Sequence, residues 1–334
     1  MSMSTRDTRF ERSIGIEVPL VCGPMYPCSN PELVAAVSEA GGIGIVQPLS
    51  LVFVHGYNFR EGMEFILSQT DRPIGLNVIT EKSSKAYQDR MEKYVDISLE
   101  MGVRFFITSL GNPKWVVDKA HAKGGIVYHD VTEAKWAKKA VDAGVDGLIA
   151  VNKRAGGHAG HLGMEELFKE LSVFDKPVLC AGGIADGSGF RRALDIGYAG
   201  VQMGTRFIAT DECKAHPDYK QAIINSDADD IVHSERITGV PVAVINTPSI
   251  QRIGTKASPL ARWMLRGHKT KHWMRMAYTV RALWDLKRSL QRPMSSKDFW
   301  QAGKSVEAIQ KIVPSASVVE ECRKQLNNGL SATG

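Results

Sequence analysis

The chain has 334 residues, a formal net charge of +6 and a hydrophobic content of 43%. That length accommodates one large α/β domain with an appendage, and the composition is that of an ordered protein rather than a low-complexity chain. No apolar run approaches the roughly 18 residues of a membrane-spanning helix, and the polar segment 1–12 lacks the apolar core of a signal peptide. The five cysteines show no CxxC pair and no metal-ligand spacing. We therefore expect a cytoplasmic protein with free thiols and no metal site.

Along the first two-thirds of the chain, short apolar runs alternate with helical patterns. The runs are nearly continuous in hydrophobicity, as strands covered on both faces are. They cover residues 18–22, 42–46, 74–79, 104–109, 126–130, 147–151, 178–181 and 200–203. The helical patterns cover residues 31–40, 62–70, 85–101, 114–123, 132–143, 164–171 and 189–196. This alternation predicts an α/β fold, a closed (β/α)8 or TIM barrel of parallel strands.

A doubly wound open sheet is the alternative for such a pattern. That fold would place a Gly-rich fingerprint after the first strand and an acidic residue at the end of the second. Here the first strand leads into Gly23, Pro24 and Met25, and the second into Gln47 and Pro48. The dinucleotide fingerprint is absent, so the barrel is preferred.

Gly-rich turns follow both the seventh and the eighth predicted strand. Gly182 and Gly183 come after the seventh strand, and Gly204 and Thr205 after the eighth. Backbone N–H groups at two adjacent turns can surround a phosphate, and these two loops are the usual phosphate site of such barrels. The glycines would alternatively only permit tight turns. Two such turns, late in the series of strands, favour the phosphate site.

The predicted carboxyl ends of the strands limit the chemistry. They lack the paired carboxylates of a glycosidase and a lysine placed for a Schiff base, and His158 and His161 are too few for a metal centre. They offer amides, glycines, a methionine and histidine. Such a set suits a flat hydrogen-bonding ring with a phosphate tail, and flavin mononucleotide (FMN) fits that description.

His158 lies in a loop of small residues, 155–160, that follows the sixth predicted strand. Small neighbours let such a loop approach a ligand closely, and a neutral imidazole can accept a proton near pH 7. The alternative is a solvated loop histidine. The position at a strand end favours a functional role for His158, and less so for His161.

The βα alternation ends near residue 210. Residues 229–258 contain short β-prone runs and no clear helix, residues 259–291 form an amphipathic helical pattern, and residues 306–325 predict a helix that packs back on the body. We therefore divide the chain into a barrel over 15–220, a lid or substrate region over 221–300, and a C-terminal helix and tail over 301–334.

The positive charge is concentrated in the segment 261–292, which holds nine Lys or Arg residues and one acid. The rest of the chain carries 33 basic and 35 acidic residues. The segment could bind an acidic substrate or carrier, or contact a membrane surface or a nucleic acid. It could equally be the solvated face of a helix whose apolar side packs on the barrel. No nucleic-acid-binding module is recognisable, and we expect no integral membrane contact.

Four motifs together resemble a known family. They are Gly23-Pro24-Met25, residues 155–160 (AGGHAG), residues 181–187 (AGGIADG) and residues 200–207 (GVQMGTRF). The set is similar to the nitronate monooxygenases, formerly called 2-nitropropane dioxygenases. It equally resembles the flavin-containing enoyl-acyl carrier protein reductases of the same superfamily. The resemblance covers about residues 15–220.

The resemblance implies an FMN-binding (β/α)8 barrel and a set of site residues. It places the residues from Gly23 to Met25 and Asn77 against the isoalloxazine ring, and it makes His158 the catalytic histidine. The phosphate would be held by four residues, with four more completing the cofactor site. The phosphate residues are Gly182, Gly183, Gly204 and Thr205, and the others are Gly157, Ala181, Gln202 and Met203.

Two activities follow from the resemblance. The first is oxidation of alkyl nitronates with O2 to a carbonyl compound and nitrite, by an FMN-dependent monooxygenase. The second is a reductase that takes electrons from NAD(P)H and acts on an enoyl thioester or a quinone, with an acidic acyl carrier as a partner. The sequence leaves the oligomeric state open, with a homodimer as one option.

Overall fold

The structure is a computed structural model that describes residues 6–81, 85–236, 240–256 and 299–331. Eight parallel strands form a closed barrel in the order β1 to β8, and β8 pairs back with β1. The strands are β1 (Leu20–Cys22), β2 (Ile43–Val46), β3 (Gly75–Ile79), β4 (Phe105–Ser109), β5 (Ile126–Val131), β6 (Gly147–Val151), β7 (Val178–Ala181) and β8 (Gly200–Met203). The predicted barrel is confirmed, and each predicted strand begins and ends within two residues of the observed one.

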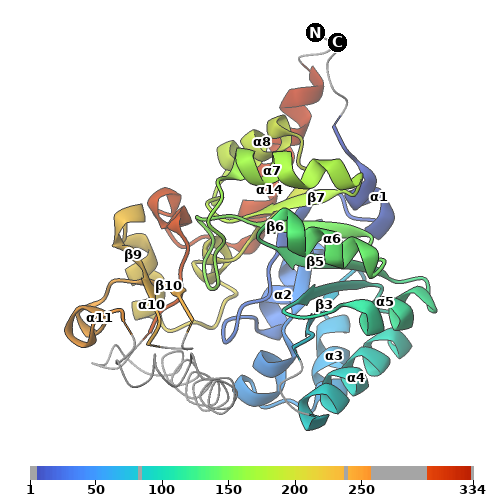
Figure 1. The fold of residues 1–334 in the computed structure, drawn as a ribbon. Coiled ribbons are helices and arrows are strands. Elements are labelled where there is room, and N and C mark those ends of the chain that lie inside the picture. Colours follow the sequence, from blue (N-terminus) through green and yellow to red (C-terminus); the bar gives the residue numbers. More distant parts are fainter. Residues whose placement is uncertain (1–5, 82–84, 237–239, 257–298, 332–334) are drawn as a thin grey trace.

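Seven helices connect successive strands around the outside of the barrel (Figure 1). They are α2 (Pro31–Glu39), α3 (Phe59–Leu67), α4 (Lys85–Glu100), α5 (Lys114–His121), α6 (Ala134–Asp142), α7 (Met164–Leu171) and α8 (Gly187–Ile196). Each corresponds to one predicted helical pattern. A π-helical turn, η1 (Ser50–Val54), precedes α3 and has no counterpart in the prediction.

Alternating residues of the strands build two separate cores. Side chains such as Val21, Ile107 and Tyr128 fill the inside of the barrel, while the residues between them pack beneath the helices. Side chains alternate between the two faces of a strand, and residues paired across parallel strands share a face. Four residues near the carboxyl ends of the strands belong to the inner core or are paired with one of its members, and therefore lie on the inner face. They are Asn77, Asp130, Ala181 and Gln202.

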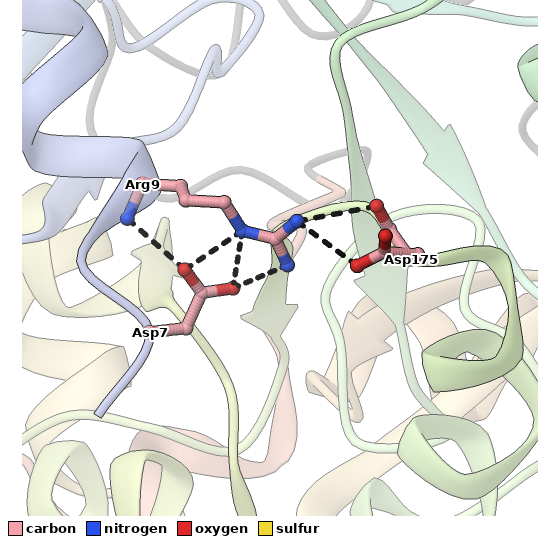
Figure 2. A network of polar contacts seen from close by, with 3 residues as sticks. All are labelled: Asp7, Arg9 and Asp175. Atoms are coloured by element: carbon pink, nitrogen blue, oxygen red, sulfur yellow. Dashed lines mark hydrogen bonds and ion pairs between the residues drawn. The ribbon is translucent and has the colours of Figure 1, made fainter. Parts of the chain in front are cut away.

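A short helix, α1 (Arg9–Ile14), packs against the amino-terminal part of the barrel interior. Phe10 is fully buried, and its ring lies 5.8 Å from that of Phe105 and 5.4 Å from that of Tyr128. Figure 2 shows how Arg9 holds the helix in place: its Nη1 donates to the carbonyl oxygen and to Oδ1 of Asp175, both at 3.2 Å. The polar sequence of segment 1–12 gave no sign of this helix.

After the barrel, the chain forms α9 (Thr205–Ile208), α10 (Pro217–Ile224) and an antiparallel pair of strands, β9 (Ile231–Ser234) and β10 (Val242–Ile245). The β-prone runs are thus confirmed, and a short helix that we did not predict, α11 (Pro248–Ile253), follows them. The N–H of Ala243 in β10 donates to the carbonyl of Gly157 at 2.9 Å. The segment after the barrel therefore contacts the loop that carries His158.

The C-terminal helix, α14 (Ser315–Ser331), begins later than predicted. A 3-10 turn, η4 (Lys304–Ala308), occupies the start of the predicted range, and Pro314 directly precedes the helix. α14 packs against α8 and α2, so it does return to the body of the barrel. The helix predicted over 259–291 lies outside the described residues.

Candidate functional site

The loops after β6 and β7 are held together by Asn152, which is almost completely buried. Its Nδ2 donates to the carbonyl of Gly182 at 2.9 Å, and its Oδ1 accepts from the N–H of Arg154 at 2.8 Å. The side chain thus fixes the start of the His158 loop against the first glycine of the turn after β7.

The glycines of this turn are required by the close approach of the two loops. Gly182 and Gly183 have φ of +113° and +76°, in the left-handed region that favours glycine. A Cβ on Gly182 would come within 2.6 Å of the backbone nitrogen of Ala155, and one on Gly183 within 2.8 Å of Nε of Arg154. A side chain at Gly182 would collide with fixed backbone, whereas one at Gly183 would displace the Arg154 side chain, and the positive φ would strain a substitution at either position.

The turn after β8 differs, because Gly204 is not crowded by protein. Among the described residues, a Cβ there would meet only Met25, with Sδ at 3.5 Å, an ordinary van der Waals distance. Thr205 is buried, and its Oγ1 accepts a hydrogen bond from the N–H of Gly303 at 2.9 Å, so its hydroxyl hydrogen can still be donated. Space beside Gly204 is therefore open for a ligand.

The two turns present backbone donors. Among the hydrogen bonds of the described residues, none is donated by the amide of Gly182, Gly183 or Gly204. Backbone N–H groups at adjacent strand ends are a common way to bind a phosphate in proteins. The residues present fit the phosphate group that the sequence predicts at this place.

His158 lies on the same end of the barrel, next to the carbonyl that β10 contacts. The side chain is accessible to solvent, yet the surrounding protein desolvates it enough to lower the pKa of the imidazole, with Glu81 opposing the change. Because the ordinary pKa of histidine is 6.5, the ring is neutral at pH 7. It can therefore accept a proton.

Polar side chains on the inner face of the barrel form the floor of the mouth. Asn77 is buried and donates to the carbonyl of Ile107 at 3.3 Å. Oε1 of Gln202 and Oδ1 of Asp130 are buried, and neither has a hydrogen-bond partner within the described part of the chain. Burial raises the pKa of Asp130 to about 7. Buried polar atoms are normally paired, so these two fit a hydrogen-bonding ring at the mouth.

The structure brings several predicted residues together. Gly23 lies against Gln202, because a Cβ on Gly23 would stand 2.9 Å from Cγ of the glutamine. The N–H of Gly23 also donates to the carbonyl of Met203 at 2.9 Å. The side chain of Met203 packs in the outer core, away from the mouth, whereas Ala181 lies in the inner core. Pro24 is partly buried beside Met25.

Three residues with a place in this geometry are not among the predicted site residues: Asn152, Arg154 and Asp130. Arg154 packs against Gly183 and pairs with Glu307 from the C-terminal segment. Alternation from Tyr128 along the fifth strand would have pointed to Asp130. Asn152 and Arg154 contact loops that are distant from them in the sequence. No local sequence pattern predicts such contacts.

Within the described ranges, no helix is long and apolar enough to cross a membrane. The same residues contain no group of three or more His, Cys, Asp or Glu side chains that could hold a metal ion.

With its candidate site residues at the carboxyl end of the strands, the molecule has the organisation of a (β/α)8-barrel enzyme. The chain belongs to the nitronate monooxygenase family, whose model matches residues 8–322. This identification confirms the resemblance seen in the sequence and makes the protein a member of a family of oxidoreductases.

Named relatives differ in the chemistry that their names describe. The chain is 30% identical over 252 residues to the (3aS,4S,5R,7aS)-5-hydroxy-7a-methyl-1-oxo-octahydro-1H-indene-4-carboxyl-CoA dehydrogenase of Rhodococcus jostii, covering 75% of this chain and 69% of that one. It is 28% identical over 258 residues to the nitronate monooxygenase of Pseudomonas aeruginosa, covering 64% and 73%. Among solved structures, FabK from Thermotoga maritima superposes with a TM-score of 0.80 at 28% identity, covering 98% and 99%.

Proposed function

We propose that the protein is an FMN-dependent nitronate monooxygenase that oxidises alkyl nitronates with O2 to a carbonyl compound and nitrite. The amides of Gly182, Gly183 and Gly204 and the hydroxyl of Thr205 would bind the phosphate. The isoalloxazine ring would contact residues on the inner face of the mouth. These ring contacts are Gly23, Pro24, Met25, Asn77, Gly157, Ala181 and Gln202, with Met203 contributing its backbone. When bound, FMN supplies the electron transfer to oxygen that amino-acid side chains cannot perform.

The observation that carries this proposal is the position of His158, on the loop after β6 at the same end of the barrel as the two glycine turns and next to the Gly157 carbonyl that accepts from the N–H of Ala243. Desolvation lowers the pKa of this imidazole. A neutral imidazole accepts a proton readily and donates one poorly. His158 can therefore remove the proton from the carbon next to a nitro group, or orient the nitro group of a nitronate that is already formed. The nearby charge of Glu81 favours the protonated imidazole that results. These roles suit oxidation of a carbon acid.

A second candidate is an NAD(P)H-dependent reductase or a dehydrogenase that acts on an acyl thioester. The name of the R. jostii relative, a CoA dehydrogenase at 30% identity, is the observation that favours it. The nine basic residues of segment 261–292 would then meet CoA phosphates or an acidic acyl carrier. A reductase needs an acid to protonate its product, and a neutral His158 is less suited to that step.

The contact of β10 with the His158 loop supports a role for region 221–300 over the mouth. We propose that this region covers the substrate and determines its choice. A cytoplasmic location and a homodimeric state remain predictions from the sequence.

Anaerobic mixing separates the two functions. The purified yellow protein is mixed with an alkyl nitronate, NADH, NADPH or an acyl-CoA, and its visible spectrum is followed. The proposal expects the nitronate to change the flavin spectrum and NAD(P)H to leave it unchanged. Bleaching by NAD(P)H, with no response to nitronate, would establish the second candidate instead. A colourless protein that gains no flavin spectrum when FMN is added would contradict both.

A further inference from the structure

Asp130 is an acidic residue on the inner face of the barrel, at the carboxyl end of β5. Tyr128, two residues earlier on the same strand, belongs to the cluster that fills the barrel. Asp130 is paired in register with Ile149 of β6, another member of that cluster. The side chain of Asp130 therefore points into the barrel where its mouth begins.

The carboxyl group has an unsatisfied oxygen. Oδ1 is buried and has no hydrogen-bond partner among the residues that the structure describes. An ionised carboxylate without a partner is costly in such a place. A second unpartnered oxygen, Oε1 of Gln202, faces the same mouth from β8. Two orphaned polar atoms on one inner face indicate that a polar ligand completes their hydrogen bonding.

The ionisable neighbours of Asp130 are few. The adjacent strands β4 and β6 contain no ionisable side chain. On β5 itself, burial raises the pKa of Tyr128 well above neutrality and lowers that of His129 to about 4. His129 faces the opposite side of the strand, with Nδ1 2.8 Å from Oγ1 of Thr108. His158 lies on the loop after β6 and interacts with the charge of Glu81. Among the described residues, burial is the one cause that shifts the pKa of Asp130.

We propose that Asp130 binds the ring of the flavin in its protonated form and donates the carboxyl hydrogen to an acceptor atom of that ring. A carboxyl group in a poorly solvated site can remain protonated near neutral pH and act as a donor. The isoalloxazine edge offers carbonyl oxygens and ring nitrogens as acceptors, whereas an ionised carboxylate would repel them. The inference rests on the proposed binding of FMN and is independent of the substrate.

Proton linkage gives this role a measurable consequence. Burial raises the pKa of Asp130 to about 7 in the protein without ligand, and a ligand that accepts its proton in a hydrogen bond raises the pKa further. Flavin affinity should therefore be highest below pH 7 and fall above it. The loss is about tenfold for each unit by which the ligand shifts the pKa.

The test measures the binding of riboflavin to the whole chain of 334 residues, and the binding of FMN serves as the check on the proposed function. Riboflavin has no phosphate, whose second ionisation near pH 6 would add its own pH dependence. Dissociation constants are measured by equilibrium dialysis and flavin fluorescence from about pH 5.5 to about pH 8.5, a range that brackets the pKa of Asp130. We expect riboflavin to bind the wild type about tenfold more weakly at the alkaline end.

Substitutions of Asp130 show how much of the pH dependence of riboflavin binding is due to its carboxyl group. Asp130→Asn keeps an N–H donor that does not titrate, so riboflavin should bind it with an affinity that is nearly independent of pH. Asp130→Ala loses the donor and should bind more weakly at the acidic end. The matched control is Asp142→Asn, which alters an exposed carboxylate paired with Lys138 on α6 and should retain the wild-type profile.

The outcomes separate this inference from the proposed function. A flat wild-type profile, or an Asp130→Asn profile that falls as steeply as the wild type, would overturn the role of Asp130 while leaving flavin binding intact. Failure of the wild type and of every variant to bind either riboflavin or FMN at any pH would overturn the proposed function, and this inference with it.

Discussion

His158 is the residue on which the proposed chemistry depends most. It lies on the loop after β6, apart from the amides of the turns after β7 and β8. We expect His158→Ala to retain FMN and to lose turnover of a neutral nitroalkane by about 10²–10⁴-fold, the usual contribution of a general base. Flavin content is read from the absorbance spectrum and turnover from nitrite release. Activity close to wild type would make His158 a structural loop residue.

The lowered pKa of His158 also predicts where activity depends on pH. The base must be neutral, so kcat/KM for a neutral nitroalkane should rise with pH through the pKa of His158 and level off above it. Because desolvation places this pKa below 6.5, the midpoint of the rise should lie below 6.5. A preformed nitronate needs no base and serves as the control. A rise centred above 6.5 would show that desolvation does not dominate at this site.

The unpartnered carboxyl of Asp130 should lower stability at neutral and alkaline pH. Its pKa is raised from 3.8 to about 7, so between these values the folded chain retains a proton that the unfolded chain has lost. Stability therefore falls as the pH rises through this window, by at most about 4 kcal/mol. Asp130→Asn should raise the melting temperature of the flavin-free chain at pH 8 more than at pH 4. An equal shift at both would contradict this.

Among the elements of the structure, the two glycine turns predict different effects of the same substitution. Gly204 has room for a Cβ, so Gly204→Ala should fold with nearly wild-type stability and bind FMN more weakly, because the methyl group enters the space for the phosphate. Gly182→Ala should destabilise the fold, because its Cβ meets the backbone of Ala155 in a left-handed conformation. Thermal unfolding and FMN titration of both variants separate the two effects. Equal effects in both would contradict the open space beside Gly204.

The strands were predictable because each is buried on both faces and reads as a continuous apolar run bounded by turn residues. β7 and β8 match their predicted bounds. The short helices were not predictable. For example, α1 owes its position to contacts of Phe10 with Phe105 and of Arg9 with Asp175, which lie more than 90 residues away in sequence. The start of α14 was misplaced because apolar residues continue through η4, which packs without forming an α-helix.

For the candidate site, the sequence could indicate only those residues whose type is itself the signal. Glycines after two late strands and a histidine between glycines can be recognised one by one. The role of Asn152 was hidden, because it depends on a carbonyl at the end of the next strand. Asp130 was visible at a strand end, but only the closed barrel shows that its Oδ1 has no partner among the described residues.

For the whole molecule, the uneven distribution of charge leads to a prediction about segment 261–292, which lies outside the described residues. If the segment binds an acidic substrate or carrier, reversing the charge at Lys269, Lys271 and Arg275 should raise KM. The effect should shrink with salt, because exposed charges are screened over about 10 Å at 0.1 M. FMN content and kcat should hardly change. A KM that is independent of ionic strength in wild type and variant would favour nitronate oxidation over a carrier-linked reaction.

The position of α14 has a consequence for how the protein is made. Arg323 donates to Glu17 just before β1 and to the carbonyl of Ala40 after α2, while Glu321 accepts from the N–H of Gly187 at the start of α8. The helix α14 thus stabilises the region where the first strand, β1, pairs with the last strand, β8. Ribosomes deliver the N-terminal part first, so a growing chain exposes unpaired strand edges, which readily join other chains, until β8 closes the ring. The helix α14, which stabilises the closed barrel, is synthesised later still.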